Sequence, residues 1–233
     1  RRYSGSMKEL EYPFDADLII KRKKQLKKQL IASDGSAGMI EKKIAILGGQ
    51  TTQDIKLAME LFLLNYGIKP VFYESEFNKY YEDAVFGNPE LESFNPEIII
   101  IFTSIVNINN IPSLNDTCNE IEAKISNELA RFKRVWESLS QRFSAVIIQN
   151  NFDFPFSQPE GNFDAVYTNG LEHFAEVLNY KFSLYAAEHN GFYIHDIHRL
   201  SAKTGLERWH NKFQFYSYKF AVNYDVMTLV SWS

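Results

Sequence analysis

Residues 48–52, Gly-Gly-Gln-Thr-Thr, join a short apolar run to a segment with helical spacing. A parallel strand that turns sharply into a helix is typical of this pattern. In open α/β sheets such a turn lies at the carboxyl end of a strand, where ligands bind. The helix start also offers unpaired backbone N–H groups to an anion or an oxyanion. The sequence therefore predicts a site lined by Gly48, Gly49, Gln50, Thr51 and Thr52.

The turn does not match a nucleotide-binding loop. A phosphate-binding loop needs a lysine after the glycines, and a dinucleotide fingerprint needs a third glycine near position 53, where Gln53 stands. What remains is a tight turn that presents Gln50 and two threonine hydroxyls at a helix start. A structural turn in which Thr51 or Thr52 caps the helix is the open alternative.

Polar side chains also follow the later apolar runs. They are Thr103, Ser104 and Asn107 after the third run, Asn150 and Asn151 after the fourth, and Asp196 and His198 after the fifth. Because the carboxyl ends of parallel strands converge on one rim of a doubly wound sheet, we expect these residues to contribute to one binding site. Amide side chains at such a rim can donate hydrogen bonds to a developing oxyanion.

Two histidines are candidate general bases. His198 follows the fifth apolar run, and His210 lies between Trp209 and Asn211 in a loop. The run from His195 to His198 contains zinc-type ligands, but its spacing is loose and residues 195 and 196 leave a strand on opposite faces. We therefore expect no metal site and no cofactor in this domain.

The elements that position these residues alternate along the chain. Helices are expected at about 17–31, 51–66, 77–86, 116–142 and 170–189, with a partly helical tail at 212–230 and a loop at 151–161. Strands are expected at 44–47, 70–74, 97–103, 145–149 and 192–195. This order predicts a three-layer α/β sandwich with a five-stranded parallel sheet.

Composition limits the classes of protein. A chain of 233 residues accommodates one large α/β domain, and its net charge of −4 gives no general attraction to nucleic acid or anionic membranes. The longest apolar run, residues 98–102, is too short to span a bilayer, and the single cysteine excludes a disulfide framework. We expect a cytoplasmic protein with neither nucleic acid nor membrane as a partner.

The amino-terminal segment is basic. We expect residues 1–6 to be an expression remnant, residues 7–40 to form a basic helix and a linker, and residues 41–233 to form the α/β domain. Six lysine and arginine residues lie between Lys21 and Lys28. They form either a solvated helix face or a docking surface for an acidic partner, such as a carrier protein or a phosphate tail.

Several short motifs together resemble a known family. They are Tyr-Pro-Phe-Asp at 12–15, Ile-Leu-Gly-Gly-Gln-Thr-Thr at 46–52, Phe-Tyr-Glu-Ser-Glu-Phe at 72–77, Phe-Gly-Asn-Pro at 86–89, Gln-Asn-Asn-Phe at 149–152 and Leu-Glu-Arg-Trp at 206–209. From about residue 8 to its end, the chain resembles the amino-terminal region of FkbH-like proteins. The resemblance implies an SGNH (GDSL-type) hydrolase-like fold with a flavodoxin-like sheet. It also implies a following haloacid-dehalogenase-type domain, whose Asp-x-Asp-x-Thr motif is absent here, and a full-length protein that loads phosphorylated three-carbon units onto acyl carrier protein.

The resemblance also implies which residues would react. The Gly-Asp-Ser block falls on residues 48–50, so Gln50 stands at the nucleophile position and Thr51 is the nearest hydroxyl. The asparagine block falls on Asn107, and the Asp-x-x-His block falls near 209–214 in altered form. Two functions remain open. One is an active esterase or acyltransferase with Thr51 as nucleophile, His210 or His198 as base, and Asn107 with backbone N–H groups near Gly49 as oxyanion donors. The other, which we favour, is a catalytically degenerate module that binds a ligand or a carrier protein.

Overall fold

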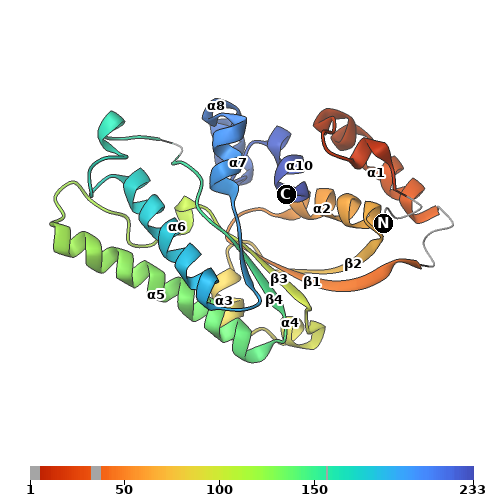
Figure 1. Ribbon diagram of the computed structural model, residues 1–233, viewed down its shortest axis with the longest axis horizontal. Helices are drawn as coiled ribbons and strands as arrows, with labels where there is room; N and C mark the ends of the chain where they lie inside the picture. The colour runs from red at the N-terminus through yellow and green to blue at the C-terminus, as the bar shows by residue number, and fades with distance from the viewer. Residues whose placement is uncertain (1–5, 33–37, 156) are drawn as a thin grey trace.

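A computed structural model describes residues 6–32, 38–155 and 157–233. Five parallel strands form one sheet in the order β2-β1-β3-β4-β5 (Figure 1). The strands are β1 (Ile40–Gly48), β2 (Ile68–Glu74), β3 (Ile98–Phe102), β4 (Val146–Asn150) and β5 (Phe192–His195). The predicted α/β fold with a five-stranded parallel sheet is confirmed. Most of the expected remnant at 1–6, the linker residues 33–37 and residue 156 of the expected loop lie outside the described residues.

Helices cover both faces of the sheet (Figure 1). One layer contains α1, α2 and α10, which contact one another, and the other contains α3, α5 and α6. The carboxyl end of β5 leads into the short helices α7, α8 and α9. The helices are α1 (Ala16–Ala32), α2 (Gln53–Asn65), α3 (Tyr80–Val85), α4 (Pro89–Phe94), α5 (Cys118–Arg142), α6 (Leu171–Glu188), α7 (Ile197–Thr204), α8 (Leu206–Trp209), α9 (Lys212–Tyr218) and α10 (Tyr224–Trp232), with single 3-10 turns η1 (Lys8–Leu10), η3 (Ile105–Asn107) and η4 (Gly161–Phe163).

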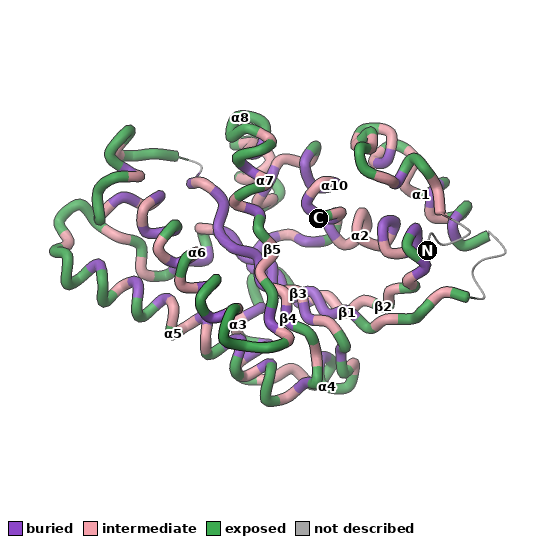
Figure 2. The backbone as a smooth tube through the Cα atoms, viewed as in Figure 1, coloured by how far each residue is buried: buried purple, intermediate pink, exposed green. Residues whose placement is uncertain are grey.

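The main core lies between the sheet and the α5–α6 layer. Buried residues follow the central strands and the inner sides of the helices in Figure 2. Trp136 of α5 and Phe182 of α6 are fully buried, with ring centroids 4.9 Å apart in an edge-to-face arrangement. Trp136 Nε1 donates to Gln149 Oε1 of β4 at 3.0 Å, so the layer is fixed to the sheet by a buried hydrogen bond as well as by packing.

Local residue chemistry sets the helix ends. Thr117 and Glu120 form a capping box at the start of α5, and Gly67, with φ +78°, follows α2 at the predicted stop. The helix predicted over 77–86 is shorter than expected, and a separate helix begins at Pro89. Asn88 caps that helix through Glu90 N at 2.9 Å and Pro89 takes its first position, which explains the break.

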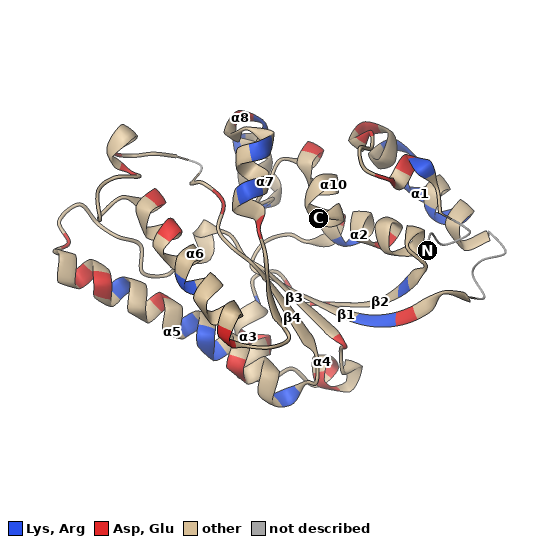
Figure 3. Ribbon diagram, in the orientation of Figure 1, with Lys and Arg blue, Asp and Glu red and all other residues tan. Residues whose placement is uncertain are grey.

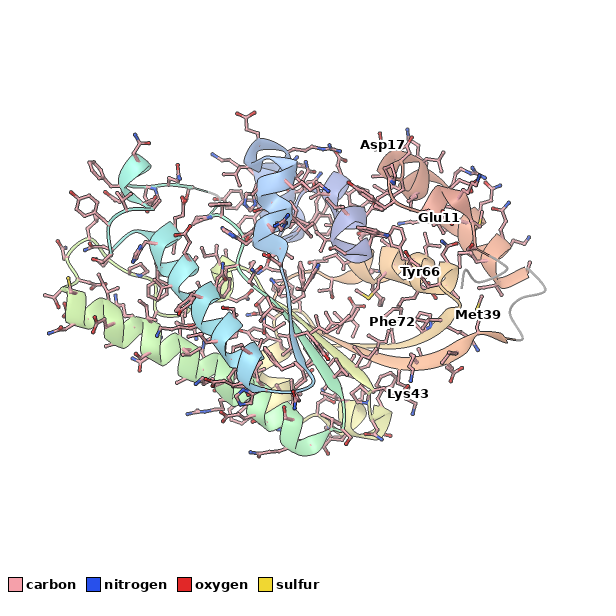
Figure 4. All side chains as sticks on the ribbon, in the orientation of Figure 1. Glu11, Asp17, Met39, Lys43, Tyr66 and Phe72 are labelled. Atoms are coloured by element: carbon pink, nitrogen blue, oxygen red, sulfur yellow. The ribbon has the colours of Figure 1, made fainter. Side chains whose placement is uncertain are left out.

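The basic helix α1 packs into the layer that also contains α2 and α10. Its buried Ile19, Leu26 and Leu30 join Leu61 and Phe62 of α2 in a third core cluster. Met39, labelled in Figure 4, packs against this cluster, and Asp17 lies in the first turn of α1. No helix in the described ranges combines the length and apolarity that a bilayer crossing requires.

Candidate binding site at the carboxyl rim

In the sheet order β2-β1-β3-β4-β5, the connection from β1 leads to one side, to β2, and the connection from β3 leads to the other side, to β4. The topological switch point therefore lies between β1 and β3. In doubly wound sheets ligands bind outside the carboxyl ends of the strands at such a switch point. Here the loops that follow β1, β3, β4 and β5 form one edge of the molecule, which we call the rim and define as residues 49–52, 103–107, 150–155 and 195–198. Gly49 and Asn107 lie at the switch point itself.

Asn107 holds the switch point together. Its Nδ2 donates to Gly49 O and to Asn78 Oδ1, both at 3.0 Å, and its Oδ1 accepts from Ser104 N at 2.9 Å. A Cβ added to Gly49 would lie 2.5 Å from Asn107 Oδ1, so the side chain at position 107 requires a glycine at position 49. Because Nδ2 carries two hydrogens, its donor capacity is fully used.

Gln50 is buried beside this centre. It is 5% exposed, and its Oε1 has no hydrogen-bond partner in the described part of the chain. Buried polar atoms in proteins are nearly always hydrogen-bonded to protein or ordered water. The Gln50 amide is therefore a group with unused hydrogen-bonding capacity at the position where the resemblance places a nucleophile.

The two threonines bond elsewhere. Thr51 Oγ1 donates to the carbonyl of Tyr218 at 2.8 Å, at the end of α9, and Thr51 N donates to Lys219 O at 3.2 Å. Thr52 Oγ1 donates to Glu74 Oε1 at 2.6 Å, and Lys56 pairs with the other oxygen of Glu74. Thr52 is the N-cap residue of α2, as the structural alternative predicts, but its side chain makes no capping hydrogen bond.

Amide side chains connect the later strand ends. Asn150 bonds both backbone groups of Thr103, with Thr103 N donating to Oδ1 at 2.8 Å and Nδ2 donating to Thr103 O at 2.7 Å. Asn151 Nδ2 donates to Asp196 Oδ1 at 2.8 Å, and His198 N donates to Asn151 Oδ1 at 3.0 Å. The structure thus brings Thr103, Asn150, Asn151, Asp196 and His198 into contact along the rim.

A buried acidic residue, Asp153, lies farther along the loop after β4 and was missed by the sequence analysis. It is 3% exposed, accepts from Trp209 Nε1 at 2.5 Å, and its Oδ2 lies 3.6 Å from His210 Nε2. Burial raises the pKa of Asp153, and His210 and the Trp209 hydrogen bond oppose that effect. A charged residue within the aromatic segment 152–156 is the one feature of the sequence that could have drawn attention to it.

The candidate bases are not bonded to the candidate nucleophile. His210 Nε2 lies 3.0 Å from the carbonyl of Phe154, and the His198 ring packs on Phe154 with its Nε2 buried and without a partner in the described chain. Within those same ranges, no hydrogen bond joins Thr51 to either histidine, and no three His, Cys, Asp or Glu side chains are grouped so that they could hold a metal ion.

A polar pocket of about 350 Å³ adjoins Asn107 on the side of α3 and α5. Its walls include Asn78, Tyr80 and Arg131. Arg131 Nη2 donates to the carbonyl of Asn107 at 2.5 Å, which ties the pocket to the switch point. Arg131 was not a predicted site residue, because its place on the inner side of α5 depends on how that helix packs.

The chain was compared with protein families, curated proteins and solved structures. The family model described as FkbH, N-terminal domain, matches residues 43–233. No match was found among curated proteins. One similar solved structure is a crystal structure of the N-terminal part of the protein BF1531 from Bacteroides fragilis, which contains a phosphatase domain complexed with Mg. The TM-score is 0.74 and the sequence identity is 18%, and the match covers 90% of this chain and 54% of that one.

A second solved structure is BT4096, a gut microbial diltiazem-metabolizing enzyme, with a TM-score of 0.50 and 13% identity over 78% of this chain and 41% of that one. At these identities both likenesses show the fold alone. The chain spans about half the length of the first structure and less than half of the second.

Proposed function

Since the chain belongs to the family of FkbH N-terminal domains, we propose that it is an SGNH-like binding module of an FkbH-like protein and does not cleave esters. The observation that carries the proposal is the hydrogen bond of Thr51. Its hydroxyl hydrogen is given to the carbonyl of Tyr218, whereas a nucleophile must give it to a base. Gln50, at the nucleophile position, cannot form an acyl intermediate.

The use of Asn107 supports the same proposal. An oxyanion hole needs donors that are free to reach the developing charge. Both Nδ2 hydrogens of Asn107 are already bonded, one to Gly49 O and one to Asn78 Oδ1. The Asn78 side-chain oxygen therefore accepts the Asn107 hydrogen that an oxyanion would need.

The partner in this proposal is an acyl carrier protein, docked on the basic helix α1. Lys23 and Lys27 pair with Asp54 and Glu60 of α2, at 3.4 and 2.8 Å. Lys21, Lys24 and Lys28 are exposed and recur at helical spacing on another side of α1. Figure 3 shows basic residues along this helix. Such a surface attracts an acidic partner mainly through long-range electrostatics. In a full-length FkbH-like protein with a haloacid-dehalogenase-type domain, docking would place the carrier for acyl or glyceryl transfer.

Hydrolysis of p-nitrophenyl acetate tests the absence of ester cleavage. The chain is compared with Thr51→Ala, His210→Ala and Asn78→Gly. The last change frees one Asn107 donor, and glycine tolerates the φ of +59° at that position. We expect the same low, non-saturating rate from all four proteins. A saturable rate that Thr51→Ala or His210→Ala abolishes, or a rate that Asn78→Gly raises, would establish the esterase alternative.

Titration with an acyl carrier protein tests the docking surface. Charge reversal by Lys24→Glu together with Lys28→Glu should weaken binding at least tenfold at low salt, and added salt should weaken binding by the unchanged chain. Arg134→Glu, on an exposed position of α5 in the opposite layer, is the matched control and should bind normally. Binding that is indifferent to salt and to the α1 reversals would exclude this surface.

A further inference from the structure

We propose that the polar pocket beside Asn107 binds the carboxylate group of a small ligand. The pocket lies between the loop after β2, α3, η3 and α5, and has a volume of about 350 Å³. Its polar lining includes Asn78, Tyr80, Glu82, Asn109 and Arg131. The inference goes beyond the docking role, because this site lies in the layer opposite α1 and would hold a small molecule.

The cation of the pocket is fixed in place. Arg131 Nε and Nη2 both donate to Glu128 Oε2, at 3.1 and 2.9 Å, Nη2 also donates to Asn107 O, and Nη1 donates to Tyr80 Oη at 2.6 Å. A guanidinium carries five N–H hydrogens. Four are used in these contacts, so one hydrogen on Nη1 has no acceptor in the described part of the chain.

Two further donors lack acceptors. Tyr80 is 3% exposed, and its oxygen accepts from Arg131 while its own hydrogen has no acceptor among the described residues. Burial raises the pKa of Tyr80 and outweighs the opposite effect of Arg131, so the phenol stays protonated. Asn78 Oδ1 is bonded to Asn107, but the Asn78 Nδ2 hydrogens have no acceptor in the same described ranges. Three donor groups, one of them on the Arg131 guanidinium, thus line one cavity with hydrogens that no group in the described part of the chain accepts.

The charges around the pocket disfavour a dianion. Glu128, fully buried behind Arg131, pairs with the guanidinium and also accepts from Asn109 N at 3.1 Å and from Asn110 N at 2.9 Å. Glu82 adds a second negative group to the wall. A dianionic phosphate would face two carboxylates with a single cation, whereas a monoanion with two oxygens matches the available donors.

Binding is tested by nuclear magnetic resonance titration of the whole chain with sodium acetate at constant ionic strength, with inorganic phosphate as the second probe. Acetate should shift the Arg131 Nε–H signal and the Tyr80 amide signal in a saturable way. Tyr80→Phe should weaken acetate binding about tenfold, the effect of one lost hydrogen bond to a charged group. Asn78→Gly should also weaken it, but by less, because the Asn107 Nδ2 hydrogen that it frees partly replaces the lost donor. Tyr180→Phe, which removes the same hydroxyl at a 64%-exposed position on α6, should leave it unchanged.

The outcomes separate the alternatives. Acetate shifts that do not saturate, or that persist unchanged in Tyr80→Phe and Asn78→Gly, overturn the pocket as the site. Phosphate binding that is tighter than acetate binding and lost in the same variants overturns the carboxylate class. Thermal unfolding tests whether each variant is folded. If Tyr80→Phe is unstable, Asn78→Gly, at an exposed position, provides the test.

Discussion

A double-mutant cycle between Gly49 and Asn107 tests whether the switch point is packed as described. Ala at position 49 would place its Cβ 2.5, 2.6 and 2.7 Å from three atoms of the Asn107 amide. These distances are too short for unbonded atoms, and the amide cannot move without losing its hydrogen bonds to Gly49, Asn78 and Ser104. Removal of the same amide by Asn107→Ala would remove all three obstructing atoms.

The magnitudes follow from these contacts. Gly49→Ala should lower the free energy of unfolding by about 1–3 kcal/mol through overpacking. Asn107→Ala should lower it by about 2–4 kcal/mol, because the buried Ser104 N and Gly49 O lose their partner. In the Asn107→Ala background the added methyl meets no amide, so the double variant should be only about as unstable as Asn107→Ala. The expected coupling energy is therefore about 1–3 kcal/mol in the compensating direction.

Equilibrium unfolding in urea provides the measurement, with circular dichroism and tryptophan fluorescence as two probes of one transition. Gly38→Ala, where an added Cβ meets nothing within 4 Å, reports the intrinsic effect of alanine and should change stability by less than about 0.5 kcal/mol. If the effects of Gly49→Ala and Asn107→Ala add within about 0.5 kcal/mol, the two residues do not interact and the described switch point is incorrect.

Two further predictions concern the edges of the rim. Burial lowers the pKa of His195 to about 4 from 6.5, so the unfolded chain takes up the proton first as pH falls. The stability that neutral His195 contributes is therefore present above pH 6.5 and lost toward pH 4. In urea unfolding at both pH values, His195→Gln should reduce that acid-induced loss by about 2–3 kcal/mol, and an equal loss in both proteins would contradict the assignment. Trp209→Phe removes the donor to buried Asp153 and should lower the free energy of unfolding by about 2–4 kcal/mol. The control Phe213→Ala, at a 68%-exposed position, should change it by less than about 0.5 kcal/mol. Similar effects of the two changes would argue against the buried hydrogen bond.

The sequence predicts the interior of the sheet better than its edges. Residues 98–102 form a continuously apolar strand buried between two helical layers, and the predicted and observed strands nearly coincide. The first four residues of β1 were missed because they pair only with β2 and are mostly exposed, so they lack a hydrophobic pattern. Helix α4 was also missed, although Asn88 and Pro89 together are a recognisable helix start.

The rim is predictable where it depends on strand order and not where it depends on distant packing. Residues that directly follow strands lie at the rim in any parallel α/β sheet, so the proximity of Gly49, Asn107 and Asn150 follows from the pattern. The partners of Thr51 and Asp153 do not. Thr51 bonds to a residue 167 positions later, and Asp153 is buried by a tryptophan 56 positions later. Both contacts depend on how the tail after β5 folds back, which no local pattern specifies.

Asparagine side chains at the rim can donate either to an oxyanion or to the loops that follow the strands, but one N–H hydrogen cannot do both. Asn107, Asn150 and Asn151 each bond backbone groups at strand ends, and Asn107 has no donor left. Gln50 differs, because its Oε1 is buried and without a partner in the described chain. Where the resemblance implies a reacting serine hydroxyl, this chain has an amide that can hydrogen-bond a ligand. Under the proposed function, asparagines that fix the rim and a glutamine whose Oε1 has no partner among the described residues suit ligand binding rather than acyl transfer through the side chains of the module.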